Sequence, residues 1–163
     1  MSYVPISALP SDARIWCYGA SARPSGANVE KLRTALASFL ESWTANRVDL
    51  KAGFDWLPEG FLVIAVDESV TGASGCSIDA LTSEIRRLER ESGIDLLDAA
   101  PVWYREATGD VRRVTRDEFR RLAAAGSVTK TTPVFDLTVE RLEAVRSGGW
   151  EVEAGRSWHA GLL

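Results

Sequence analysis

Cysteine and histidine are scarce in this chain of 163 residues, which has two cysteines, Cys17 and Cys76, and one histidine, His159. Three such side chains cannot supply the four ligands of a structural zinc site unless carboxylates contribute. The sequence has no CxxC, HExxH or EF-hand spacing, so we expect neither a bound metal nor another cofactor. In a reducing compartment both cysteines are expected to be free thiols.

Long apolar runs and excess positive charge are also missing. No run reaches the roughly 18 apolar residues of a membrane span. The N-terminal stretch MSYVPISALPSDAR has neither the basic nor the apolar segment of a signal peptide, so we expect a cytoplasmic protein with no membrane partner. The formal net charge of -4 disfavours tight nonspecific binding to nucleic acid.

The residues that are present describe an ordinary globular domain. Hydrophobic residues make up 45% of the chain and charged residues 26%, which is typical of a folded domain rather than a disordered chain. The length suits one domain spanning residues 1–163, large enough to bury a sizeable core.

The order of periodic segments predicts an α+β fold. Strand-like runs are RIWCY, DLKAGFDW, GFLVIAV and PVWYRE. Apolar residues recur at helical spacing over about 28–45, and again from the end of loop 72–79 to Gly93. The short turn LPEG should join the second and third strands as a hairpin. The resulting order, βαββαβ over residues 14–106, is the split βαβ or ferredoxin-like arrangement.

Residues 107–163 form a C-terminal extension in this interpretation. A further strand, DVRRV, should pair with PVWYRE, and Thr115 with Glu118 forms a capping box that opens a helix. Another helix is expected at about 139–146. Because residues 61–66 are apolar without alternation, both faces of that strand should be buried. We therefore expect the helical extension, or the second subunit of a homodimer, to cover the open face of the sheet.

The loop from Gly72 to Asp79, GASGCSID, is the candidate site. Cys76 stands directly before the second helix, where the helix dipole and free N–H groups favour an anion such as a thiolate. Ser77 is a good N-cap residue, and Asp79 fits the first turn. The loop has no lysine and the wrong glycine spacing for a P-loop, so no nucleotide site is predicted.

The expected topology supplies neighbours for this loop. The segment WTANRVDLK should lie at the same end of the sheet, which makes Thr44 and Lys51 candidate ligand-binding residues together with Gly75, Ser77 and Asp79. Cys17 should lie toward the other end, too far for a disulfide with Cys76.

Three residues are candidates for catalysis: Cys76 as thiolate nucleophile, Asp67 as acid or base, and His159 as activator of the thiol. Each also has a structural interpretation. Cysteine is a common small buried residue, Asp67 and Glu68 suit a solvated strand end, and the terminal SWH suits a docking clip with Trp158 buried and His159 at the surface.

The segments SWTANRVDLKAGF, FLVIAVDESVTGASGCSID, PVFDLTV and SWH resemble a family of small bacterial proteins whose members often carry the label "ABC transporter ATPase". The resemblance runs from about Ile15 to His159, and GASGCSID is its most specific part. It implies that Trp43, Thr44, Lys51, Asp67, Cys76, Asp79 and the residues SWH surround one pocket. It implies no activity, and the ATPase label has no support because Walker A and LSGGQ-like motifs are missing.

Two other classes of function are open. A ferredoxin-like sheet can stack RNA bases on strand aromatics, here Trp16, Tyr18 and Phe61, but the stacking motif is poorly met and the chain is acidic. The six tryptophans also suit a non-catalytic interaction or assembly module. The leading hypothesis is a small-molecule or anion site at the loop from Gly72 to Asp79, with catalysis undecided.

Overall fold

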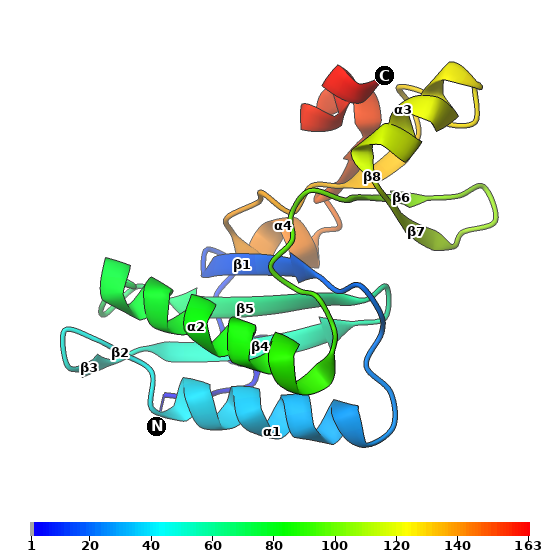
Figure 1. Ribbon diagram of the computed structural model, residues 1–163. Coiled ribbons are helices and arrows are strands. Elements are labelled where there is room, and N and C mark those ends of the chain that lie inside the picture. The colour runs from blue at the N-terminus through cyan, green and yellow to red at the C-terminus, as the bar shows by residue number, and fades with distance from the viewer. Residues whose placement is uncertain (1) are drawn as a thin grey trace.

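The central sheet has three antiparallel strands in the order β1–β5–β4: β1 is Arg14–Gly19, β4 is Lys51–Leu57 and β5 is Phe61–Asp67. The computed structural model, which describes residues 2–163, is shown in Figure 1. β4 and β5 form the expected hairpin, with Lys51 opposite Asp67. Its turn includes Gly60, whose φ of 100° lies in the region that favours glycine.

Two helices, α1 (Ala27–Glu41) and α2 (Gly75–Ser92), cover one face of this sheet (Figure 1). The even-numbered side chains of β5 point toward them, because successive side chains of a strand alternate between faces. Leu62, Ile64 and Val66 pack there in one core with Leu36 of α1 and Ile85 of α2. The small hairpin β2 (Thr44–Ala45) and β3 (Val48–Asp49) follows α1.

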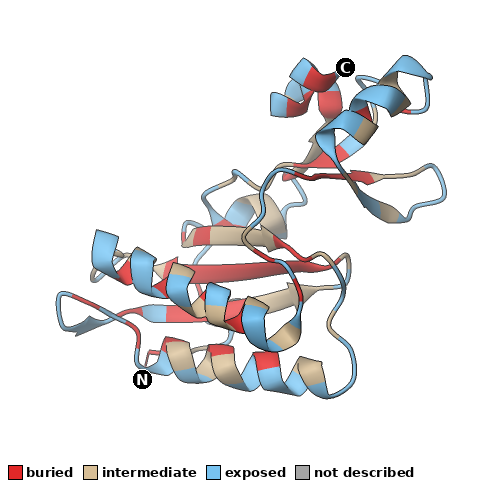
Figure 2. Cartoon of the chain, viewed as in Figure 1, coloured by how far each residue is buried: buried red, intermediate tan, exposed pale blue. Residues whose placement is uncertain are grey.

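The C-terminal part of the chain covers the opposite face. Val63 and Ala65 pack with Leu142 of the short helix α4 (Leu142–Arg146). Phe61 packs with Trp103, Phe135 and Trp150. Figure 2 shows β5 as the continuously buried strand of the sheet. The prediction that both faces of residues 61–66 are buried is therefore confirmed.

The expected fourth strand of the ferredoxin-like sheet does not pair in the central sheet. β6 (Val102–Arg105) belongs to a second antiparallel sheet with the order β7–β6–β8–β9. The other strands of that sheet are β7 (Val111–Val114), β8 (Pro133–Phe135) and β9 (Glu151–Glu153). The α+β class is confirmed, but the strand order does not match the ferredoxin-like topology.

Competition for the outer edge of β1 explains this difference. The Ile15 amide donates to the Glu140 carbonyl at 2.9 Å, and the Leu142 amide donates to the Ala13 carbonyl at 2.9 Å. The place expected for β6 is therefore partly taken by residues from the C-terminal extension. β6 instead pairs with β7 as the predicted hairpin on one side and with β8 on the other.

The remaining elements are α3 (Arg116–Ala124) and three 3₁₀ turns, η1 (Ile6–Ala8), η2 (Ala154–Arg156) and η3 (Trp158–Leu162). Thr115 caps α3, since its side chain accepts from the Glu118 amide, which is one of the two hydrogen bonds of the predicted capping box. α1 ends at Glu41, before the expected boundary at residue 45, because Thr44 and Ala45 enter β2. Among the helices of residues 2–163, none has the length and apolar character needed to cross a bilayer.

Candidate functional site

The start of α2 differs from its predicted form. Ser74, not Ser77, is the N-cap residue: its side chain accepts from the Ser77 amide at 3.2 Å. The Ser77 hydroxyl oxygen in turn accepts from the Ser74 amide at 2.7 Å. This reciprocal box satisfies two of the free N–H groups at the helix start. Cys76 is thereby the second residue of α2 rather than the residue before it.

Cys76 is exposed beside a shallow depression of about 430 Å³. Thr44, Asn46 and Ser74 line the same depression. The Trp43 indole N–H donates to the Ser77 carbonyl at 2.9 Å, and this buried bond fixes β2 against α2. The structure therefore brings the segment at residues 43–44 to the cysteine loop, as the topology argument predicted.

Lys51 and Asp67 lie opposite each other where β4 and β5 meet this end of the sheet, and neither lines the depression beside Cys76. Asp67 accepts from the Ser69 amide at 3.0 Å. Hydrogen bonds from Ser69, assisted by the positive charge of Lys51, hold the pKa of Asp67 below its usual range. Gly75 and Asp79 are exposed on the first turns of α2. The catalytic and binding roles of these residues remain predictions.

His159 lies in η3, in the opposite part of the molecule from the start of α2 (Figure 1). Its ring is fully buried, its Nδ1 is 2.6 Å from Ser157 Oγ, and it stacks on Trp158 with the ring centroids 3.8 Å apart. Burial lowers the pKa of His159 to about 4. The structure does not bring this histidine to Cys76. The docking-clip interpretation is also reversed in detail, since His159 is buried and Trp158 is 38% exposed.

The two cysteines are free and separate, as expected. Cys17 lies on the face of the sheet that the C-terminal part covers, packed against the core that contains Val63 and Leu142. Burial, and secondarily the charge of Asp136, raise the pKa of its thiol to about 12. At neutral pH Cys17 is therefore a protonated packing residue with no nucleophilic thiolate.

The aromatic side chains considered for RNA stacking are not presented on an open sheet face. Trp16 and Tyr18 pack against the helix-covered core, and Phe61 is fully buried. Three arginines within residues 112–121, a stretch rich in arginine, form ion pairs with acidic neighbours: Arg112 with Glu106, Arg120 with Asp117 and Arg121 with Glu118. This arrangement gives the RNA-binding alternative no stacking platform.

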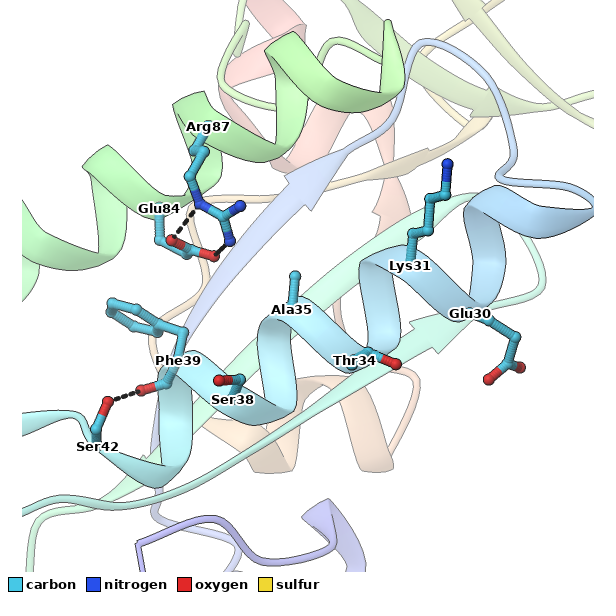
Figure 3. A pocket seen from close by; sticks show the side chains of 9 residues that line it. All are labelled: Glu30, Lys31, Thr34, Ala35, Ser38, Phe39, Ser42, Glu84 and Arg87. Carbon is cyan, nitrogen blue, oxygen red and sulfur yellow. Dashed lines mark hydrogen bonds and ion pairs between the residues drawn. The ribbon is translucent and has the colours of Figure 1, made fainter.

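A groove of about 640 Å³ runs between α1 and α2 (Figure 3). Its charged side chains are already paired or point apart: Arg87 bonds Glu84 and Glu91, and Figure 3 shows Glu30 and Lys31 directed away from each other. The groove is a solvated seam between two helices. Within residues 2–163, no cluster of histidine, cysteine and acidic side chains suits a metal ion.

A more enclosed cleft of about 610 Å³ lies between the two sheets. Its walls come from β1 at Cys17–Gly19, from the connection at residues 96–101, and from β8 with the residues that follow it. Trp103, Arg116 and Trp158 also line it. The Arg116 guanidinium carbon lies 4.7 Å from the centroid of the Trp158 ring, and its Nε donates to the Ala100 carbonyl at 2.8 Å.

Gly19 and Trp103 together shape this cleft. A Cβ atom at Gly19 would lie 2.2 Å from the Trp103 ring, far inside van der Waals contact. The glycine therefore lets the indole rest directly on the end of β1. Trp103 itself is 4% exposed and packs against Phe61, with ring centroids 6.0 Å apart.

Part of β1, from Cys17 to Gly19, borders the cleft, and Gly19 is itself a buried residue. Since the Ile15 amide bonds outward to Glu140, alternation along an antiparallel strand directs the N–H and C=O groups of Cys17 and Gly19 to the same outer edge. Within the described chain, no segment pairs with that edge at Cys17 or Gly19. The wall of the cleft thus carries main-chain donors and acceptors that have no strand partner within residues 2–163.

Sequence reasoning missed this cleft. Its lining comes from stretches separated by tens of residues, and the sequence contains no motif that links them. The available signal was the glycine that ends RIWCYG, a residue type that often marks close approach of another group to a strand.

Comparison of the chain with protein-family models, with curated proteins and with solved structures found no match. The resemblance to the small bacterial family therefore stays a prediction.

Proposed function

We propose that the protein binds a small organic molecule in the cleft between its two sheets. The observation that carries this proposal is a cleft of about 610 Å³ that combines aromatic walls with the unpaired main-chain edge of Cys17–Gly19. Ligand sites are typically concave, largely apolar and of this size, with a few polar groups that orient the ligand.

The lining has the composition expected of such a site. Trp103, Phe135 and Leu137 supply apolar surface, and the indole of Trp158 lies at the exposed part. Arg116 forms no ion pair with a carboxylate of residues 2–163, so its guanidinium can meet an acceptor on a ligand. Asp98 supplies the opposite charge, and its Oδ1 accepts from the Ala100 amide at 2.9 Å.

Binding is favoured over catalysis at this cleft. The one thiol in its wall, Cys17, has a pKa raised to about 12 and is protonated at neutral pH. The imidazole of His159 is behind Trp158 and fully buried. Among the described residues, the lining of the cleft therefore offers groups that orient a ligand rather than an activated thiol or imidazole.

The test is a screen of small organic fragments by ligand-observed NMR with the full chain. Fragments of about 12 non-hydrogen atoms are expected to bind with Kd on the order of 1 mM. Ala99→Phe should remove this binding, because Ala99 is an exposed residue of the cleft wall and a phenyl group would fill the space. Ala107→Phe, at an exposed turn outside the cleft, is the matched control. Binding that survives Ala99→Phe, or no binding at all, would refute the proposal.

The loop from Gly72 to Asp79 remains a second prediction for a small-molecule or anion site, with Cys76 as the candidate thiolate. Its support is that Thr44 and the exposed Cys76 line one depression. A non-catalytic interaction module, a homodimer and a cytoplasmic location also remain predictions.

A further inference from the structure

We infer that the ligand of the cleft between the sheets is an extended, peptide-like molecule of two or three residues that pairs with the outer edge of β1 as a short additional strand. This inference rests on the proposed function and names the chemical class of the ligand. It makes the ligand the occupant of the stretch of the β1 edge, at Cys17–Gly19, that pairs neither with β6 nor with the C-terminal extension.

The spacing of the open main-chain groups carries the inference. Cys17 and Gly19 each present one N–H donor and one C=O acceptor to the outer edge of β1. Two residues of a strand span about 6.6 Å, so the two donor–acceptor pairs repeat at the distance of alternate residues in an extended peptide. An unpaired strand edge of this kind is a template for strand addition.

The chain closes this edge at both ends, which fixes the length of the ligand. At one end the Ile15 amide is bonded to the Glu140 carbonyl. At the other end the Ser21 amide bonds the Asp95 carbonyl at 2.9 Å, and the Asp95 amide bonds Ser21 Oγ at 2.8 Å. The open edge is about three residues, or roughly 10 Å, long. A long strand of a partner protein does not fit between these closures, whereas a short peptide does.

Apolar surface lies on both sides of this edge. Trp103, Phe135 and Leu137 lie toward the second sheet, and Leu96 and Leu97 belong to the core on the helix-covered side. Side chains of an added strand alternate between the two sides. The ligand is therefore expected to carry apolar side chains at successive positions.

The experiment is a titration of the ¹⁵N-labelled full chain with capped tripeptides, acetylated and amidated, built from valine, leucine and phenylalanine. Binding should shift the amide resonances of Cys17 and Gly19, with Kd on the order of 1 mM for the best sequence. Ala99→Phe should weaken binding at least 10-fold, and Ala107→Phe should leave it unchanged.

N-methylation of the best tripeptide, one residue at a time, distinguishes pairing from simple apolar contact. Strand pairing uses alternate N–H groups of the ligand, so affinity should fall at least 10-fold either at the central residue alone or at the first and third residues alone. Equal tolerance of all three methyl groups, or equal loss at all three, would overturn the inference. If fragments bind but no tripeptide does, the inference fails while the proposed function stands. If neither class binds, both fail.

Discussion

Gly19 shows how one missing side chain shapes the molecule. We predict that Gly19→Ala lowers the free energy of unfolding by about 1–3 kcal/mol, the usual cost of forcing extra volume into a packed site. The reason is the 2.2 Å approach of the added Cβ to the ring of Trp103, which is itself 4% exposed and packs against Phe61. Urea unfolding followed by circular dichroism measures the change.

Gly75→Ala is the matched control for that substitution. A Cβ at Gly75 meets no atom within 4 Å, and the residue begins α2. The free energy of unfolding should stay constant or rise by up to about 1 kcal/mol, because alanine loses less backbone entropy than glycine in a helix. Equal destabilisation by the two substitutions would contradict the role given to Gly19.

The two thiols should differ in reactivity. We predict that iodoacetamide at pH 8 modifies Cys76 and leaves Cys17 intact in the folded protein, because Cys76 is exposed and Cys17 is not. With its pKa raised to about 12, Cys17 would be thiolate in on the order of one molecule in 10,000 at that pH. Peptide mapping by mass spectrometry identifies which cysteine carries the alkyl group.

Both cysteines should react after denaturation, which is the internal control for the alkylation. Modification of Cys17 at a rate similar to Cys76 in the folded protein would show that the cleft wall opens. Alkylation of Cys76 with no loss of any bound fragment would place ligand binding away from the loop from Gly72 to Asp79, as proposed.

At the scale of elements, local sequence was sufficient to predict some of the helix ends, but it was not sufficient to predict all of the strand pairs. Thr115 caps α3 and the left-handed Gly93 ends α2, as the sequence indicated, because each depends on neighbours within one helical turn. The N-cap of α2 was misplaced within the stretch SGCS, since Ser74 and Ser77 are both good caps and each bonds the other. Sequence pattern alone does not choose between two such serines.

The strand with which β6 pairs could not be predicted from nearby sequence, for a different reason. The competing occupant of the β1 edge is Glu140, which is 125 residues from Ile15. Periodicity identifies a strand, but it does not rank the edges that the strand can join. The hairpin of β6 with β7 was predictable because only a short turn separates them.

The η3 turn should make stability depend on pH. His159, the single histidine of the chain, has a pKa lowered to about 4 by burial. Between about pH 4 and 6.5, its imidazole is therefore protonated in the unfolded chain and neutral in the folded chain. The contribution is complete above pH 6.5 and is lost as the pH falls toward 4. It amounts to on the order of 3 kcal/mol.

Urea unfolding at several pH values between 4 and 7 tests this contribution against His159→Phe, which cannot titrate. Carboxylates titrate in both proteins, so the difference between the two curves isolates the histidine. The slope in this pH range should be smaller in the variant. Identical slopes would show that the imidazole is not excluded from water in the folded state.

At the scale of the whole molecule, the cleft exists because the second sheet packs beside β1 of the central sheet. Its lining joins β1, the connection at residues 96–101, β8 and η3. The sequence indicated that something covers β5, since its run of apolar residues has no alternation. It did not indicate which segments would meet above β1, because that depends on side-chain packing such as Trp103 on Gly19.

The same packing predicts that the two sheets unfold together. Leu142 of α4 is 2% exposed and packs with Val63 and Ala65 of β5, so Leu142→Ala removes contacts that join the C-terminal part to the central sheet. We expect the free energy of unfolding to fall by about 2–5 kcal/mol, the range for a buried leucine.

Circular dichroism and tryptophan fluorescence, measured on the same urea series, show whether the loss of stability affects both sheets together. Tryptophans lie in both parts, Trp43 beside the helices and Trp150 beside the second sheet, so coincident transitions mean one cooperative unit. Leu163→Ala, at a residue that is 45% exposed, should change stability by less than about 0.5 kcal/mol. An early, separate transition in Leu142→Ala would show that the second sheet detaches alone. The cleft would then be an interface that opens, because its two walls would no longer be held by a common core.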